Sequence, residues 1–152
     1  MSFDTPDGTR GARQPRANRL LRWGNTAMMS RIRRNGGRAM GMDALVLTTV
    51  GRKTGQPRTC PLACFPDGPN SWLIVASAAG APRNPAWYYN LAANPDRVRI
   101  EIGDRSLEVT AAQLHGDERT RAWDRITATS KQFSKYQIKT DREIPIIRLT
   151  AR

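Results

Sequence analysis

A short basic turn is the stretch whose residue types are suited to chemistry. It runs Gly51-Arg52-Lys53-Thr54-Gly55-Gln56-Pro57-Arg58, between two apolar runs at Ala44 to Val50 and Thr59 to Phe65. Both runs are rich in β-branched and aliphatic residues, which predicts two strands joined by this turn. The glycines allow backbone N–H groups to point into one concave site. Because arginine and lysine bind phosphate and carboxylate oxygens, the turn is a candidate anion site at the rim of a sheet.

Composition alone favours a simpler interpretation, a hairpin turn with solvated cations, because charged turns are common and exposed ion pairs contribute little. The turn is not a P-loop, since Arg52 stands where that motif needs its second glycine and no helix is expected to follow. The chain has two cysteines and one histidine, too few for the usual zinc sites. A Ser-His-Asp catalytic triad would depend on His115 alone. Cys60 and Cys64 are predicted to lie in one strand, too far apart to bridge each other.

Length and composition indicate one globular domain. The chain has 152 residues, of which 39% are hydrophobic and 25% charged. It contains no apolar run of about 18 residues and no signal-peptide core, so we expect a cytoplasmic protein. The net charge is +12, and residues 1–40 carry nine arginines against Asp4 and Asp7. This excess suits nucleic acid or an anionic membrane surface as a partner, and equally a solvated tail.

Three regions are expected along the chain. Residues 1–16 are rich in Gly, Pro, Asp and Arg and are predicted to be a disordered basic arm. Residues 17–35 show helical spacing of apolar residues among arginines, which predicts a basic amphipathic helix ended by glycines. This helix packs on its own domain or lies on a membrane interface. Residues 36–152 form the remaining domain.

That domain is predicted to hold about six mostly antiparallel strands. After the basic hairpin, strands are expected at Trp72 to Ala76, Arg97 to Ile102, Ser106 to Ala112 and Ile144 to Leu149. One helix is expected to start with Asn84 as N-cap and Pro85 as its first residue, and another to run from Asp117 to Thr129. His115 is interpreted as a polar residue at a strand end. Antiparallel strands without βαβ alternation predict an α+β barrel with flanking helices.

Three blocks of sequence carry a resemblance to a known family. They are residues 45–58, ending in GRKTGQPR; Asn84-Pro85-Ala86-Trp87-Tyr88 with Asn94-Pro95; and Thr140-Asp141-Arg142-Glu143-Ile144-Pro145-Ile146. Their order and spacing over about residues 44–147 resemble the deazaflavin-dependent nitroreductase family. The resemblance implies a split β-barrel of the FMN-binding, pyridoxamine-phosphate-oxidase-like type. It also implies an oxidoreductase that transfers hydride from reduced coenzyme F420 to a quinone or similar electrophile, nitro compounds included.

The resemblance further implies site residues. Those implied to bind the coenzyme are Arg52, Lys53, Thr54, Gln56, Pro57 and Arg58 at the turn, and Ala76, Ser77, Ala78, Ala86 and Trp87 around the ring. Tyr136 and Ser77 are the candidate donors to the acceptor, and no metal is implied. Ala78 and Ala79 stand where relatives often have a lysine and a glycine, so we expect one coenzyme contact to be absent. Phe133 stands where a close relative has tyrosine and Lys139 where one has tryptophan, so we expect an altered acceptor pocket.

Alternatives from other classes stay open. One is an FMN-dependent or non-catalytic coenzyme-binding split barrel. Another is a basic nucleic-acid-binding barrel, which is disfavoured because exposed aromatics do not alternate with lysines along the strands. The N-terminal helix is a candidate for peripheral contact with the inner face of the cell membrane. The sequence does not distinguish a monomer from a homodimer.

Overall fold

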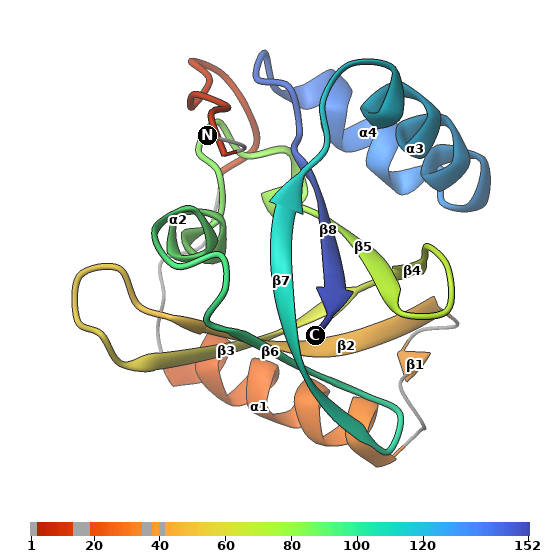
Figure 1. Cartoon of the computed structure of the whole chain (residues 1–152). Helices are drawn as coiled ribbons and strands as arrows, with labels where there is room; N and C mark the ends of the chain where they lie inside the picture. The colour runs from red at the N-terminus through yellow and green to blue at the C-terminus, as the bar shows by residue number, and fades with distance from the viewer. Residues whose placement is uncertain (1–2, 14–18, 35–37, 40–41) are drawn as a thin grey trace.

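The chain forms a curled antiparallel sheet, with α1 below it and α3 and α4 at its opposite end (Figure 1). The computed structural model describes residues 3–13, 19–34, 38–39 and 42–152. In chain order the elements are α1 (Arg19–Arg34), β1 (Arg38–Ala39), β2 (Met42–Val50), β3 (Pro57–Ala63), β4 (Phe65–Pro66), β5 (Ser71–Val75), the 3-10 helix η1 (Ala78–Gly80), α2 (Ala86–Ala93), β6 (Val98–Ile102), β7 (Arg105–Gln113), α3 (Gly116–Thr129), α4 (Gln132–Lys139) and β8 (Ile146–Ala151).

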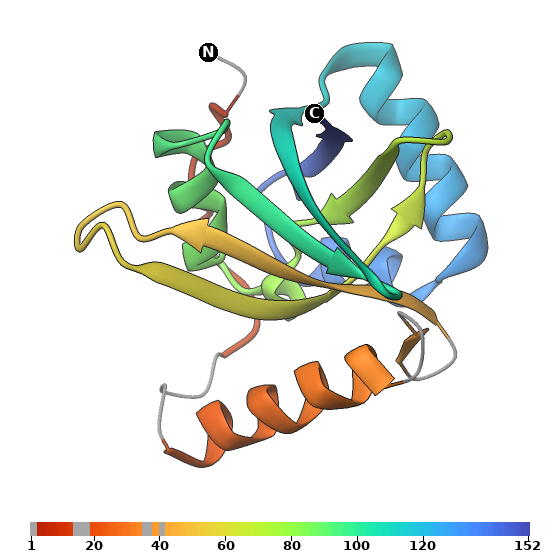
Figure 2. The same cartoon turned by 60° about the horizontal axis from the view of Figure 1, so that its bottom comes forward.

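Strand pairing places the basic turn at the open end of a long hairpin. The sheet order is β1-β2-β6-β7-β8-β5-β4, and β3 pairs with β2. The β2–β3 pairing continues to Val50 opposite Pro57, whereas β6 pairs with β2 only from Val46 to Thr48. The hairpin therefore extends past β6 and ends beside α2 (Figures 1 and 2).

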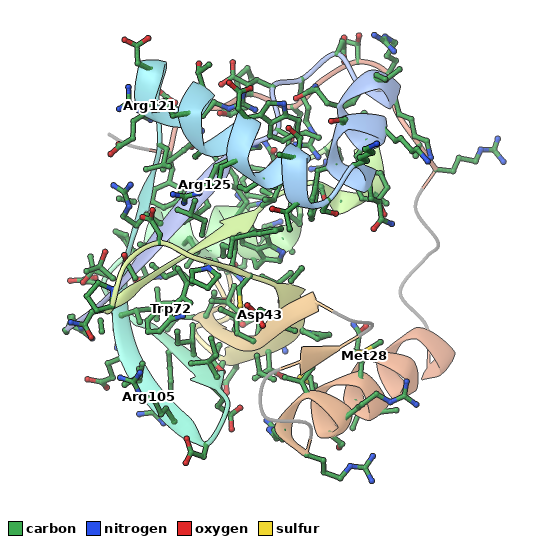
Figure 3. All side chains as sticks on the ribbon, turned by 90° about the vertical axis from the view of Figure 1, so that its right-hand side faces the viewer. Met28, Asp43, Trp72, Arg105, Arg121 and Arg125 are labelled. Carbon is green, nitrogen blue, oxygen red and sulfur yellow. The ribbon has the colours of Figure 1, made fainter. Side chains whose placement is uncertain are left out.

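Strand β2 is buried on both faces, which explains its unbroken apolar run. Leu45 and Leu47 belong to the main core between the sheet and α2. Val46, which is 0% exposed, points the other way and packs against Ile32 of α1. Met28 lies on the side of α1 that faces the sheet (Figure 3). Helix α1 thus covers the outer face of β2 with its apolar side, and among the described residues no helix is both long and apolar enough to cross a bilayer.

The described residues contain more elements than the sequence predicted. There are eight strands and four α-helices, where about six strands and three helices were expected. Strands β1 and β4 have two residues each, too few to produce a hydrophobic period, and α4 is a polar segment. Helix α2 begins one residue later than predicted, because Pro85 is its N-cap and Asn84 lies outside it.

The N-terminal segment, residues 3–13, follows a defined path along the domain, which differs from the predicted disordered arm. The Gly8 N–H donates to the Pro82 carbonyl over 2.7 Å, and the Ala12 N–H donates to the Gly80 carbonyl over 2.9 Å. Composition did not reveal this path because its partners are distant in sequence. The remainder of the predicted arm, residues 1–2 and 14–16, lies outside the described residues.

Asp141 anchors the middle of this segment. Its carboxylate accepts hydrogen bonds from the Thr9 hydroxyl, from the Arg10 N–H over 3.1 Å and from the Thr9 N–H over 2.7 Å. These bonds, that of the Thr9 hydroxyl first, lower the pKa of Asp141 from 3.8 to about 2. Because the folded-state pKa is the lower one, the carboxylate stabilises the attachment above about pH 4, and this stabilisation is lost as the pH falls toward about 2.

We expect Asp141→Asn to release the segment at neutral pH, because an amide accepts these hydrogen bonds more weakly than a carboxylate. Hydrogen exchange measured by NMR should then give lower protection factors for the amides of Thr9 and Arg10. The unmodified chain should lose the same protection on acidification between about pH 4 and 2. Equal protection in variant and unmodified chain would contradict the anchor.

Candidate functional site

Strands β2 and β3 and helix α2 enclose a cavity of about 460 Å³ at the basic turn. Its lining residues are Thr49, Gly51, Arg52, Lys53, Thr54, Arg58, Thr59, Cys60, Ala86, Trp87, Tyr89 and Asn90. The turn and α2 are far apart in sequence and lie side by side in the fold (Figure 1). The structure therefore gathers the three cations of the turn and Trp87 around one hollow.

The turn is shaped by its own backbone. The Gly51 N–H donates to the Gln56 carbonyl over 2.8 Å, and the Gly55 N–H donates to the Gly51 carbonyl over 2.8 Å. Gly55 has φ of +71°, a conformation that favours glycine. The Gln56 N–H donates to the Thr54 hydroxyl over 3.2 Å. Gln56 thus closes the turn and is not among the cavity's lining residues.

Asn90 joins the turn to helix α2. Its side chain is 7% exposed; the carbonyl oxygen accepts from the Arg52 N–H and the amide nitrogen donates to the Thr49 hydroxyl, each over 3.1 Å. A buried amide needs such partners, and here they fix the distance between turn and helix. The sequence analysis missed this residue, although an asparagine inside the apolar helix AWYYNLAA was a usable signal.

Positive charge in the cavity is not compensated by nearby acids. Arg52, Lys53 and Arg58 are exposed, and within the described residues none of them forms a salt bridge with a carboxylate. The Arg52 guanidinium carbon lies 4.7 Å from the centre of the Tyr89 ring, a cation–π contact that holds it over α2. Two guanidinium forks and one ammonium are the donors that a ligand with phosphate and carboxylate groups requires.

A second, more apolar cavity adjoins the first. It has a volume of about 660 Å³ and is lined by Gly11, Ala12, Arg13, Asn25, Ala78, Ala81, Pro82, Arg83, Asn84, Pro85 and Ala86. Ala86 lines both cavities. The N-terminal segment contributes Gly11, Ala12 and Arg13 to the lining. It packs directly on residues 80–82, because a Cβ on Gly11 would lie 2.4 Å from the Gly80 carbonyl oxygen. Small apolar residues make up much of the lining of this cavity.

The other predicted site residues lie around these cavities rather than in the first one. Pro57 starts β3 and pairs with Val50. Ala78 lines the apolar cavity, while Ala76 is buried and Ser77 is half-buried directly before it. Of these three consecutive residues, Ala78 is the one that lines the second cavity.

Tyr136 lies on α4 and is not among the described residues that line either cavity. Its hydroxyl accepts a hydrogen bond from the Gln132 amide nitrogen. The ring centre lies 6.0 Å from that of Phe133. Its carbonyl oxygen is beside η1, since a Cβ on Gly80 would lie 2.8 Å from it. Helix α4 therefore places the backbone of Tyr136 next to the turn that carries Ser77 and Ala78.

The cysteine prediction was wrong on one point. Strand β3 ends at Ala63, so Cys64 lies outside the strand that was predicted to hold both thiols; both are free. Cys60 lines the cation-lined cavity, and burial raises the pKa of its thiol to about 12. The thiol is therefore neutral at physiological pH and a poor nucleophile. In the part of the chain that the structure describes, no group of three or more His, Cys, Asp or Glu is placed to hold a metal ion.

Comparisons with known proteins place this chain in one family. A sequence model described as F420H(2)-dependent quinone reductase matches residues 21–151. An F420H(2)-dependent quinone reductase of Mycobacterium tuberculosis is 44% identical over 112 residues, which cover 72% of this chain and 74% of that protein. A solved F420-H2 dependent reductase is 36% identical with a TM-score of 0.63, covering 70% of this chain and 92% of its own.

More distant structures agree on the fold. A domain-swapped dimer is 32% identical with a TM-score of 0.65 and covers 86% of this chain and 98% of its own. A pyridoxamine 5'-phosphate oxidase-like structure from Listeria innocua is 14% identical with a TM-score of 0.51, covers 84% and 90%, and bears on the fold alone. The predicted α+β split barrel is thus confirmed, coenzyme F420 is the cofactor that the matched family implies, and FMN finds no support. The chain belongs to the F420H(2)-dependent quinone reductase family.

Proposed function

We propose that this chain transfers hydride from reduced coenzyme F420 to a quinone or a similar electrophilic acceptor. The observation that carries the proposal is that Ala86 lines two cavities. One is lined by cations that form no salt bridge within the described part of the chain, and the other is lined mainly by small apolar residues. An acidic tail suits the first cavity, and flat rings suit the second. Relatives described as F420H(2)-dependent quinone reductases support this donor and this acceptor.

The coenzyme is bound in this proposal by the β2–β3 turn. Arg52, Lys53 and Arg58 hold its phosphate and acidic tail, and the Thr54 hydroxyl offers a neutral partner at the same rim. Gln56 acts indirectly by closing the turn through its bond with Gly51, and Pro57 by starting β3 opposite Val50.

The ring region has to orient two planar groups and keep water away. Reduced F420, when bound, supplies the hydride. Ala86 lines both cavities, Trp87 lines the cation-lined cavity and Ala78 lines the apolar cavity. Small residues in the apolar cavity let a ring approach the backbone, which favours close alignment of donor and acceptor.

Negative charge develops on the acceptor oxygen as hydride arrives, so a nearby donor stabilises it. Tyr136 is our first candidate. Because its hydroxyl accepts the N–H of Gln132, its own O–H proton stays available for donation. Ser77 is the second candidate, beside Ala78 of the apolar cavity.

The test is an oxidation assay. Purified chain is mixed with reduced F420 and menadione, and the absorbance of oxidised F420 is followed with time. Catalysed oxidation supports the proposal. Tight binding of F420 without oxidation favours a non-catalytic carrier, and oxidation of reduced FMN in place of reduced F420 favours the flavin alternative.

Reduction of nitro compounds is a narrower proposal for the same site. Lys139, one of the two departures expected to alter the acceptor pocket, is exposed with its ammonium 5.9 Å from the centre of the Tyr136 ring. Phe133, the other departure, is 8% exposed in the core formed by α3, α4 and the sheet. We expect nitro compounds to be poorer acceptors than menadione in the same assay, and equal rates would contradict this order.

Helix α1 is proposed as a peripheral contact with an anionic membrane surface. Arg31, Arg33 and Arg34 lie in its last turn and are exposed, which suits anionic headgroups. Arg33 also forms a salt bridge with Glu101 of β6 over 2.8 Å, so its charge is partly neutralised within the domain. Sedimentation with liposomes tests the contact: binding has to require anionic lipid and to disappear at high salt.

A further inference from the structure

Arg142 is a buried arginine to which the proposed function gives no role. It is 3% exposed, and its guanidinium donates four hydrogen bonds within one segment of chain. The acceptors are the carbonyl oxygens of Ala76 (3.0 Å), Ser77 (2.8 Å) and Ala81 (2.9 Å) and the Asn84 side-chain oxygen (2.8 Å). A buried guanidinium this fully satisfied holds its partners in a fixed arrangement.

The segment between those acceptors is strained. Ala78, Ala79 and Gly80 have φ of +45°, +54° and +82°. For a residue with a Cβ, this left-handed conformation is unfavourable and persists only where the surroundings enforce it. Arg142 bonds to carbonyls on both sides of the strained residues, so it supplies that enforcement.

We propose that Arg142 is a positioning residue for hydride transfer, holding the strained turn at residues 76–81 as the wall of the apolar cavity. The proposal rests on the proposed function, because that wall is where the ring is placed. The four hydrogen bonds of Arg142 form a clamp, and two observations link this clamp to the site. First, the apolar cavity is lined by two residues that accept hydrogen bonds from Arg142, Ala81 and Asn84, and by Ala78 of the strained turn. Second, the cation-lined cavity contains none of the four acceptors.

Because Arg142 supports the apolar cavity and not the cation-lined one, its substitution is expected to change kcat more than the affinity for F420. Arg142→Lys keeps one positive charge but offers a single ammonium in place of the fork, so it cannot bond to both sides of the turn. A shift of the wall by about 1 Å costs on the order of 100-fold in rate. We expect kcat with menadione to fall by about 30-fold or more, while the dissociation constant of F420 changes by less than about threefold because the cations are untouched.

Arg119→Lys is the matched control. Arg119 is also largely buried, with 14% of its side chain exposed, and its guanidinium donates to the Ile144 carbonyl over 2.7 Å. Its bonds do not involve the turn. We expect this variant to lose thermal stability comparably to Arg142→Lys and to keep its kcat. A parallel loss of kcat in both variants would reduce Arg142 to a purely structural role and overturn the proposal.

Hydrogen exchange gives a readout that does not need activity. The amides of Gly80 and Ala81 donate to the carbonyls of Ser77 and Ala78, and they should lose protection in Arg142→Lys while the β2–β3 ladder keeps it. Unchanged protection would overturn the clamp even if F420 were not the coenzyme. Failure of the unmodified chain to oxidise reduced F420, with protection lost as expected, would instead overturn the proposed function alone.

A second-site substitution covers the case in which Arg142→Lys is too unstable to assay. Ala79→Gly lowers the cost of positive φ, so it should raise both yield and kcat of the Arg142→Lys chain by about three- to tenfold. The same substitution should change the unmodified chain less, because the clamp already enforces the turn there. Equal effects in the two backgrounds would show that clamp and strain are independent, against the proposal.

Discussion

The Arg52→Ala, Lys53→Ala double variant is expected to bind coenzyme F420 about 30- to 100-fold more weakly than the unmodified chain. A charge-assisted hydrogen bond at an accessible site contributes about 1 to 1.5 kcal/mol, and about 1.4 kcal/mol corresponds to a tenfold change in affinity. The free energy of unfolding should change little, since both side chains are exposed. The Arg52 N–H bond to Asn90 survives because alanine keeps the backbone amide. Titration calorimetry with F420 measures the effect.

The control removes the same charge elsewhere. Arg105 at the start of β7 and Arg121 on α3 are exposed arginines, both labelled in Figure 3, and neither lines the cation-lined cavity. Their double alanine variant lowers the net charge by the same two units, and we expect its F420 affinity to stay within about twofold. Equal weakening by both double variants would mean that general attraction, rather than the turn, binds the coenzyme. Raising the salt concentration should reduce the difference between the two variants.

Local signals were sufficient to predict the basic hairpin. Two apolar runs flank a turn with glycines at positions 51 and 55, and the structure has strands β2 and β3 there with Gly55 at positive φ. The continuous apolar run of β2 was also interpretable as a strand, although its cause lies in a tertiary contact, the packing of Val46 against Ile32 of α1. The sequence pattern therefore predicted strand β2, but it did not decide whether α1 packs on this strand.

Residues that act through distant partners could not be assigned from the sequence. Asn90 reaches a turn 38 positions earlier, and Arg142 reaches carbonyls more than 60 positions earlier. Asp141 binds Thr9 across 132 positions, which orders a segment whose composition resembles a disordered arm. The apolar helix around Asn90 indicates that this side chain needs a polar partner. Spacing and hydrophobic period nevertheless do not identify the partner of Asn90, Arg142 or Asp141. Such contacts need the folded chain.

In the proposed function, Ala86 lies between the cavity that binds the acidic tail of the coenzyme and the cavity that holds its ring. It is the first residue of α2, it is exposed, and it lines both the cation-lined and the apolar cavity. A coenzyme whose tail is held at the turn and whose ring reaches the apolar wall has to pass this side chain. A methyl group leaves that passage open, whereas a phenyl ring fills it.

Ala86→Phe should therefore lower kcat/KM for the oxidation of reduced F420 by menadione by about 100-fold, because hydride transfer requires the reacting atoms within about 3.5 Å. Ala93→Phe, at the last residue of the same helix and equally exposed, is the matched control. Both substitutions lower helix propensity by about 0.5 kcal/mol, so their melting temperatures should agree while their activities differ. Activity of Ala86→Phe within about twofold of the control would mean that the ring does not pass Ala86, and the coenzyme would then have to lie along β3, toward Thr59 and Cys60.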